Sequence, residues 1–188
     1  MIKVAICGNI ASGKTEAQKI IEDMNYPVLD TDKVSHSILE EHSSVIITTF
    51  SGYDILENNH ISREKLGMLV FNNTNLKTKL ENVVHPIVKD KIMQFFSENN
   101  DKKYAFVAIP LLFEANMQDI FDKIIFIYSN DDIRLKRLLN RNNYDEEYAK
   151  IRINSQLSQD IKASKADYVI YNNESLNNLK NELIKLIL

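Results

Sequence analysis

The sequence predicts an α/β fold built around a parallel sheet, and three observations lead to that prediction. First, five short runs are apolar almost without interruption, which is typical of strands covered on both faces. Second, stretches with helical spacing of apolar residues separate these runs, as crossovers between parallel strands require. Third, the chain has 188 residues, 44% of them hydrophobic, which suits one core. We therefore expect a single domain spanning residues 1–188.

The predicted elements follow one another in a regular order. The five strands are residues 2–7, 27–30, 104–110, 123–129 and 167–172. A helix over residues 14–24 follows the first strand, and the closing stretch places its leucines and isoleucines on one helical face. Residues 31–103 predict several helices, one of them starting at Pro86 with His85 extended before it. Residues 130–165 predict two helices that meet near the asparagine-rich stretch at 140–145.

Composition excludes several classes of protein. A formal net charge of −3 argues against binding nucleic acid, which needs a basic face. No apolar run approaches the ~18 residues of a membrane span, so we expect no membrane association. The one cysteine, Cys7, lies in an apolar run and is expected to be a core residue without a redox role. A lone thiol also fits a reducing cytoplasm.

The strongest motif is "GNIASGKT", residues 8–15, which fits G-x-x-x-x-G-K-[ST]. A strand precedes it and a helix follows, so the backbone N–H groups can surround a phosphate at the helix N-terminus. Lys14 would neutralise the β- and γ-phosphate oxygens, while the Thr15 hydroxyl would ligate Mg²⁺. The motif predicts binding of a nucleoside triphosphate without saying which reaction follows. The residues expected around the phosphates are Gly8, Ala11, Ser12, Gly13, Lys14, Thr15 and Glu16.

The residues around this motif favour a kinase over a switch or a motor. Neither N-K-x-D nor D-x-x-G occurs, and the third strand ends in Pro110 instead of an acid. An acidic pair, Asp30 and Asp32, follows the second strand at the edge that the phosphate loop shares. An aspartate there can lie near Mg²⁺ or accept the proton of an attacking hydroxyl. Capping of the next helix is the alternative role for one of the two acids.

Several basic residues are candidates for the same site. Arg137 and Arg141 lie four residues apart on one helix face, where a closing lid would bring them onto the phosphates. A solvated helix face explains their spacing equally well, and for Arg134 we expect that exposed position. His36 lies one turn beyond Asp32, either facing the same cleft or on the surface. The four histidines show no zinc-binding spacing.

Taken in order, seven segments resemble the dephospho-coenzyme A kinase family over most of the chain, from residue 2 to beyond residue 173. They are "GNIASGKT", "VLDTDKVSH", "REKLGMLVF", "HPIV", "IPLLFE", "RLKRLLNRNNYDEEYAKIRINSQ" and "ADYVIYN". The resemblance implies a three-layer P-loop kinase fold: a five-stranded parallel sheet, a helical substrate segment (34–100) and a helical lid (139–160). It implies transfer of the γ-phosphate of ATP, with Mg²⁺, to the ribose 3′-hydroxyl of dephospho-coenzyme A, the final step of coenzyme A biosynthesis.

The resemblance also implies roles for individual residues. Asp32 would be the catalytic aspartate, and Arg141, with Arg137, would contact the phosphates from the lid. The residues placed near the acceptor are Asp32, His36, Arg63, His85, Leu111 and Leu112, and those near the adenine are Asn172 and Asn173.

The chain departs from the family's usual loop at Asn9, Ala11 and Glu16, the first two of which replace glycine. Because alanine resists the left-handed conformation, we predict that Ala11 keeps a negative φ. Asn142 after the lid arginine and Ser62 before Arg63 are further departures, each where the family often has aspartate.

Two other functions stay open. The same architecture serves kinases for nucleoside monophosphates or small metabolites, and it also serves ATP-bound regulatory modules that have no acceptor. We expect a cytoplasmic enzyme that acts as a monomer or weak homo-oligomer on a small-molecule substrate.

Overall fold

The computed structural model describes residues 1–142 and 145–187, and the side chains of residues 141 and 142 are not among the described atoms. The contacts between Cα atoms divide the chain into two compact units. The first unit contains Met1–Asp30 and Phe96–Leu188, and the second contains Thr31–Phe95. We describe each unit by itself.

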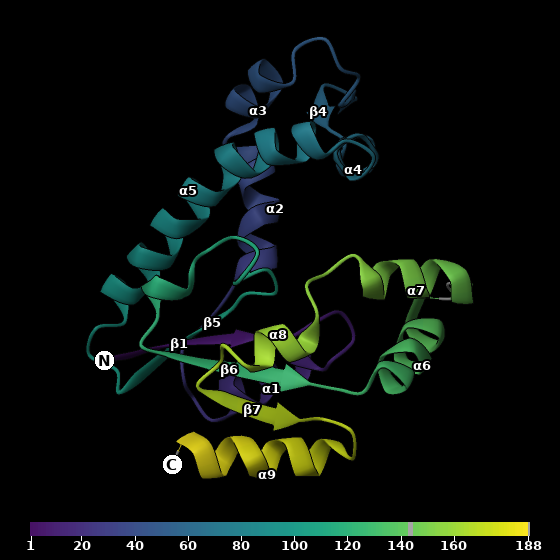
Figure 1. Ribbon diagram of the computed structural model, residues 1–188. Helices are drawn as coiled ribbons and strands as arrows, with labels where there is room; N and C mark the ends of the chain where they lie inside the picture. Colours follow the sequence, from purple (N-terminus) through teal and green to yellow (C-terminus); the bar gives the residue numbers. More distant parts are fainter. Residues whose placement is uncertain (143–144, 188) are drawn as a thin grey trace. The chain divides into compact units, whose positions relative to one another are not determined.

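The first unit is built on a five-stranded parallel sheet with the order β2-β5-β1-β6-β7 (Figure 1). Its strands are β1 (Ile2–Cys7), β2 (Val28–Asp30), β5 (Tyr104–Ala108), β6 (Lys123–Tyr128) and β7 (Tyr168–Tyr171). All five predicted strands are present, and their ends differ from the prediction by one or two residues at most. The predicted α/β class with a parallel sheet is therefore confirmed.

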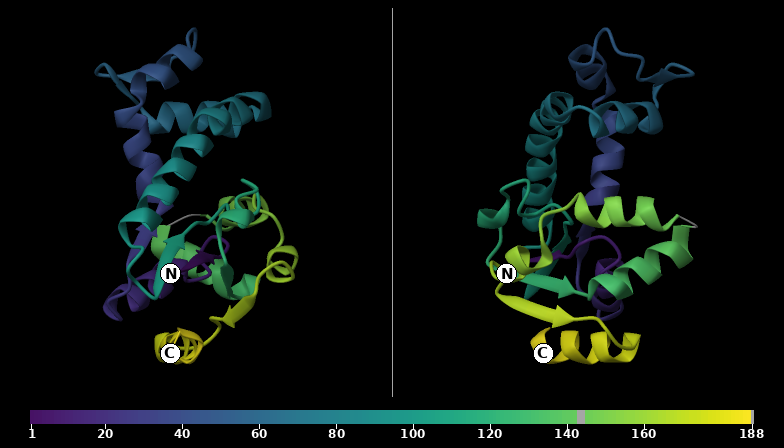
Figure 2. Two further views of the ribbon diagram at one scale, coloured as in Figure 1. Left: turned by 90° about the vertical axis from the view of Figure 1, so that its left-hand side faces the viewer. Right: turned by 45° about the vertical axis from the view of Figure 1, so that its right-hand side comes forward.

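Helices flank this sheet. They are α1 (Lys14–Asp23), the 3₁₀ turn η1 (Gln118–Ile120), α6 (Asp131–Asn142), α7 (Glu146–Asn154), α8 (Gln159–Ala163) and α9 (Leu176–Ile187). Figure 2 shows α9 running beside β7, and α9 also contacts α1. The core between the sheet and these two helices includes Ile6, Ile21 and Leu183. Residues 130–165 hold three helices instead of the predicted two, because the short helix α8 follows α7.

The second unit is largely helical. It contains α2 (Thr31–Glu41), α3 (Ser43–Thr49), α4 (Arg63–Phe71), most of α5 (Thr74–Glu98), and the antiparallel hairpin of β3 (Leu56–Glu57) and β4 (His60–Ile61). The hairpin was not predicted. Asn58 and Asn59 form its two-residue turn with φ of 49° and 66°, values that asparagine tolerates better than most residues.

Pro86 does not start a helix, so that prediction was wrong. Helix α5 runs through both His85 and Pro86. The proline ring removes one backbone hydrogen bond, a cost of about 3 kcal/mol in a helix interior. Burial of Leu76 before the proline, and of Val88 and Ile92 after it, holds both halves of the helix in place.

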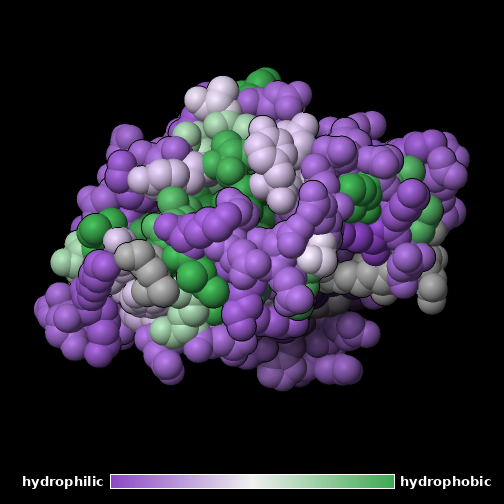
Figure 3. All heavy atoms as spheres, turned by 90° about the horizontal axis from the view of Figure 1, so that it is seen from below, coloured by the Kyte–Doolittle hydropathy of each residue, from purple (hydrophilic) through white to green (hydrophobic). Residues whose placement is uncertain are grey.

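Among the described residues, no helix is long and apolar enough to cross a membrane. Figure 3 shows one face of the molecule, on which hydrophilic side chains predominate and hydrophobic atoms form small separate areas.

Candidate active site

The phosphate loop connects β1 to α1, and both of its glycines are needed there. A Cβ on Gly8 would lie 2.5 Å from Ser12 Oγ and 2.8 Å from the Ile127 carbonyl oxygen. Gly13 has φ +103°, and a Cβ there would lie 2.0 Å from Asn172 Nδ2. Gly13 is also the cap residue of α1 and has no side chain that could bind the first N–H groups of the helix. A helix N-terminus of this kind can bind an anion.

Ala11 has φ +61°, so the prediction of a negative φ was wrong. The chain must turn sharply between Asn9 and Ser12, where the Ser12 N–H donates to the Asn9 carbonyl at 3.0 Å. A left-handed alanine costs about 1–2 kcal/mol, and such a residue persists only where its surroundings determine the conformation. The Ala11 side chain packs against the cluster of Leu138, Ala149 and Ile153 between α6 and α7.

The carbonyl of Ser12 is bound from several sides. It accepts hydrogen bonds from Asn172 Nδ2 at 2.8 Å, Ser129 Oγ at 3.1 Å and Arg137 Nη1 at 3.3 Å. Because three side chains bind this carbonyl, the peptide between Ser12 and Gly13 is held in one orientation. These side chains come from the ends of β6 and β7 and from α6, so the sheet edge itself braces the loop.

Arg137 is engaged with the protein in this structure. Its Nη1 also donates to the Ala11 carbonyl at 3.2 Å and to Ser129 Oγ at 2.9 Å, while Nη2 donates to the Asn172 carbonyl at 2.9 Å. Desolvation by burial lowers the pKa of its guanidinium. The group lies directly behind the phosphate loop, and its contact with ATP stays a prediction.

Arg134 is not on a solvated face, and that expectation was wrong. Its side chain is 2% exposed, and burial lowers the pKa of its guanidinium. Nη1 pairs with Asp131 Oδ1 at 2.7 Å, and Nε donates to the Ile10 carbonyl at 2.9 Å. The periodicity of charges along α6 could not distinguish this buried arginine from its exposed neighbours.

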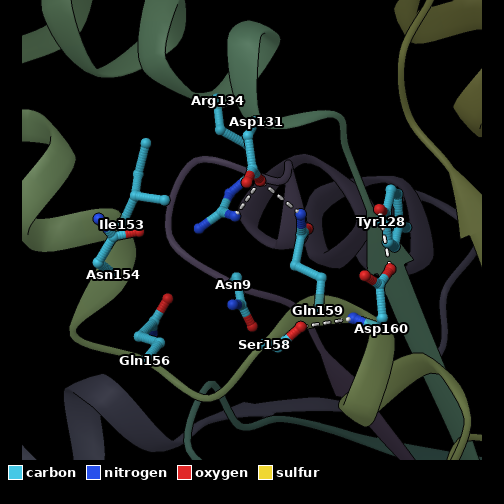
Figure 4. A pocket seen from close by; sticks show the side chains of 10 residues that line it. All are labelled: Asn9, Tyr128, Asp131, Arg134, Ile153, Asn154, Gln156, Ser158, Gln159 and Asp160. Atoms are coloured by element: carbon cyan, nitrogen blue, oxygen red, sulfur yellow. Dashed lines mark hydrogen bonds and ion pairs between the residues drawn. The ribbon is translucent and has the colours of Figure 1, made fainter.

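A cavity of about 300 Å³ lies next to Arg134, lined by residues that Figure 4 labels. Arg134 and Asn9 are two of the residues that line it. Arg134 Nη2 and Asn9 Oδ1 are buried, and neither finds a hydrogen-bond partner among the described residues.

The residues at the start of α1 fit the predicted ligands. Thr15 is exposed, so its hydroxyl is accessible to a metal ion beside the loop. Glu16 pairs with Lys19 at 3.0 Å, which directs its carboxylate along the helix surface. The contacts of Lys14 and Thr15 with phosphate and Mg²⁺ stay a prediction.

The strand register places Asp30 at the same edge of the sheet as the loop. Asp30 is the last residue of β2 and is level with Ala108, which in turn is level with Ile6 two residues before Gly8. Asp32 lies in the first turn of α2, two residues along the chain from Asp30. Asp32 and His36 are both exposed and lie four residues apart on this helix.

The remaining predicted residues lie in separate places. Arg63 is the exposed first residue of α4, whose N-cap is Ser62, and His85 is half-buried within α5. Asn173 pairs with Asn130 through two hydrogen bonds of 2.8 and 3.1 Å. Leu111 is exposed, whereas Leu112 is fully buried and packs in the core. Arg141 lies in the last turn of α6, but its side chain is outside the described atoms.

Cys7 is buried, as expected for a core residue. Burial raises the pKa of its thiol to about 12, so the thiol is neutral at ordinary pH. Its Sγ lies 3.6 Å from the Ile125 carbonyl oxygen.

Sequence reasoning missed three residues that hold the site together: Ser129, Gln156 and Lys162. Lys162 is fully buried, with Nζ 2.6 Å from Glu114 Oε1. This contact is an ion pair, and Lys162 Nζ has no hydrogen-bond partner among the described residues. The only sequence signal for these three residues is that each is polar and lies near the end of a strand or helix. Many exposed residues have the same two properties, so the signal could not single them out.

Comparison with known proteins gives a consistent result. The sequence model of the dephospho-CoA kinase family matches residues 2–178. A dephospho-CoA kinase from Listeria innocua is 36% identical over 191 residues, covering 98% of this chain and 94% of that protein. The structure of a dephospho-CoA kinase from Campylobacter jejuni has a TM-score of 0.72 at 33% identity, covering 98% of this chain and 94% of the other. A crystal structure from Thermus thermophilus has a TM-score of 0.89 at 27% identity, covering 99% of this chain and 96% of the other.

Proposed function

Because the chain belongs to the dephospho-CoA kinase family, we propose that it transfers the γ-phosphate of ATP to the ribose 3′-hydroxyl of dephospho-coenzyme A. Phosphorylation of dephospho-CoA is the family's reaction and the final step of CoA biosynthesis. In this reaction the 3′-oxygen forms a bond to the γ-phosphorus. The bond between that phosphorus and the oxygen that bridges the β- and γ-phosphorus atoms breaks. ADP leaves, and the hydroxyl proton passes to a base.

The observation that carries the proposal is the shared edge of the sheet. The phosphate loop follows β1, and Asp30 closes β2 at the matching position of the register. Asp32, two residues further, is exposed at the start of α2 and would orient or deprotonate the acceptor hydroxyl. Lys14 and the loop N–H groups would hold the β- and γ-phosphates, and Arg141 would stabilise the charge of the transferring group.

Mg²⁺ fits the residues at the loop. Thr15 is exposed and carries a hydroxyl oxygen, the kind of ligand that Mg²⁺ prefers, at the start of the helix that follows the loop. When bound, the ion would neutralise charge on the phosphate oxygens. We assign the acceptor to the second unit, near His36, Arg63 and His85, with Leu111 contributing from the loop after β5, and the adenine to the region of Asn173. We place the enzyme in the cytoplasm, as a monomer or weak homo-oligomer.

A panel of acceptors tests the proposal. The protein is incubated with ATP labelled on the γ-phosphate, Mg²⁺ and one acceptor at a time: dephospho-coenzyme A, a nucleoside monophosphate, shikimate or water alone. We expect labelled product with dephospho-coenzyme A and at most trace transfer to the others. Phosphorylation of another acceptor instead would indicate a different small-molecule kinase. ATP binding without transfer to any acceptor would indicate a regulatory module.

A further inference from the structure

One residue of the phosphate loop, Ile10, has both its backbone N–H and its backbone carbonyl bound by side chains. The N–H of Ile10 donates to Gln156 Oε1 at 2.7 Å, and its carbonyl accepts from Arg134 Nε at 2.9 Å. Next to it, Asn9 Nδ2 donates to the Leu157 carbonyl at 2.9 Å. Arg134 comes from α6, while Gln156 and Leu157 follow α7, and Figure 4 shows Arg134, Asn9 and Gln156 around the same cavity. We call the pair of Arg134 and Gln156 the Ile10 clamp.

The arginine of the clamp is itself fixed. Its Nη1 pairs with Asp131, whose Oδ1 also accepts from Gln159 Nε2 at 2.9 Å. Gln159 Nε2 lies 2.9 Å from the Ser129 carbonyl oxygen at the end of β6. Burial of a guanidinium is costly, and these contacts offset the cost only with the side chain in this position. The donor that reaches Ile10 is therefore held rigidly.

The residue after Ile10 is Ala11, the strained residue of the loop. Its φ of +61° is a conformation that glycine adopts freely and alanine does not. Arg134 binds the carbonyl of the peptide between Ile10 and Ala11, and Arg137 binds the carbonyl of the peptide between Ala11 and Ser12. Gln156 binds the N–H of the preceding peptide, between Asn9 and Ile10. Side chains thus hold both peptides that flank Ala11, and Gln156 fixes the residue before them.

We propose that Arg134 and Gln156 are positioning residues that hold Ala11 in its left-handed conformation and so keep the loop ready to bind phosphate. They need no contact with the nucleotide, because they act through the backbone of Ile10. A glycine at position 11 would adopt the left-handed conformation without strain. With alanine at this position, the clamp holds the loop in that conformation instead. This inference rests on the proposed function only in taking ATP as the ligand.

The proposal predicts a specific coupling between the clamp and position 11. With the clamp in place, the loop is already in its binding conformation, so replacing Ala11 by glycine has little to improve. Without the clamp, only a fraction of molecules have a competent loop, and the apparent dissociation constant rises as that fraction falls. Glycine at position 11 raises the fraction of molecules with a competent loop, because glycine adopts the left-handed conformation without the strain that drives alanine out of it.

The experiment measures the dissociation constant of Mg·ATP by titration calorimetry for the full chain, with melting temperatures recorded in parallel. The variants are Gln156→Leu, Arg134→Met, Ala11→Gly and the doubles that add Ala11→Gly to each clamp variant. The matched control is Lys136→Met, which removes an exposed charge from the same helix. We expect each clamp variant to weaken ATP binding about 5–10-fold, the effect of losing a hydrogen bond that fixes the loop, and the control to bind like the wild type.

The decisive comparison is the effect of Ala11→Gly in the two backgrounds. We expect it to improve ATP binding at least about threefold more in the Gln156→Leu protein than in the wild-type protein. Equal effects in both backgrounds would overturn the proposal, as would unchanged ATP binding in Gln156→Leu. If Arg134→Met does not fold, the Gln156→Leu pair decides alone. A wild-type protein that does not bind ATP would instead refute the proposed function, so the two failures are distinguishable.

Discussion

Lys162, which is fully buried in α8, places Nζ 2.6 Å from Oε1 of Glu114 in the loop after β5. The same carboxylate oxygen accepts from the Leu157 N–H at 3.3 Å. Leu157 also binds Asn9 of the phosphate loop through its carbonyl. Glu114 thus joins the segment that follows α7 to the loop after β5, and Leu157 joins that segment to the phosphate loop.

Replacing either partner of this ion pair should destabilise the protein, but to different extents. Glu114→Gln leaves the Lys162 charge buried without a counter-charge, which should cost about 3–5 kcal/mol. Lys162→Met should cost less, about 1–2 kcal/mol, because the Glu114 side chain is 28% exposed and can turn to water. Urea unfolding measures both values. Lys185→Met, which removes an exposed lysine, is the control and should stay within about 0.5 kcal/mol of the wild type. Equal losses for Glu114→Gln and the control would show that the charge of Lys162 needs no partner.

Asp32→Ala should lower turnover by orders of magnitude while ATP binding survives. The carboxylate is expected to act on the acceptor hydroxyl, so its removal leaves the phosphate loop intact. Steady-state kinetics with dephospho-coenzyme A, combined with ATP titration, separates the two effects. Asp119→Asn, an exposed acid in η1, serves as the control for loss of a surface charge. Turnover near the wild-type level in Asp32→Ala would remove Asp32 from the mechanism.

The residues that sequence reasoning placed correctly are those whose role is set locally. The strands followed from apolar runs, and Gly8, Gly13 and the acid after β2 followed from spacing alone. The errors concern residues whose conformation is decided by distant partners. Ala11 is left-handed because side chains from α6 and from the segment after α7 hold its neighbours, and no local pattern shows this.

The predictions that a helix starts at Pro86 and that Arg134 is exposed were wrong for the same reason. Packing on both sides keeps α5 continuous through the proline, and Asp131, Ile10 and Gln159 form the environment that buries Arg134. Propensity and charge periodicity describe a segment without its neighbours, so they fail where tertiary contacts oppose them.

Arg141→Ala should mainly slow the phosphoryl-transfer step. Arg141 lies in the last turn of α6, one helical turn beyond Arg137. A guanidinium that meets charge only in the transition state contributes to the rate and little to ground-state binding. Single-turnover measurements with saturating ATP should show a fall of about 100-fold or more. An unchanged single-turnover rate would exclude Arg141 from the transfer step.

Cys7 should resist thiol reagents in the folded protein. Burial raises the pKa of its thiol from 9.0 to about 12, so the reactive thiolate is almost absent at pH 8. Iodoacetamide should label the protein in urea and leave it unlabelled in buffer, and stoichiometric labelling in buffer would contradict the buried position.

The same pKa shift predicts a pH dependence of stability. Because the folded state disfavours the thiolate, the contribution of Cys7 is complete below pH 9 and is lost as the pH rises from 9 towards 12. Cys7→Ala removes this group, so the free energy of unfolding of the wild-type protein should fall more steeply over this interval than that of the variant. Parallel slopes would show that the thiol does not titrate differently in the two states.

Gly13→Ala should disrupt the loop through Asn172. A Cβ at position 13 would lie 2.0 Å from Asn172 Nδ2, which donates to the Ser12 carbonyl, and the φ of +103° strains any side chain. Asn172 must move away, so the Ser12 peptide loses a partner and the helix N-terminus loses its alignment with the phosphates. We expect ATP binding to fall at least about 100-fold while the melting temperature drops by only a few degrees, since the core below the loop is unchanged. Gly67→Ala, at a helical position with open space around it, is the matched control and should bind ATP normally. If Gly13→Ala bound ATP as tightly as this control, the close approach of Asn172 would not be what fixes the loop.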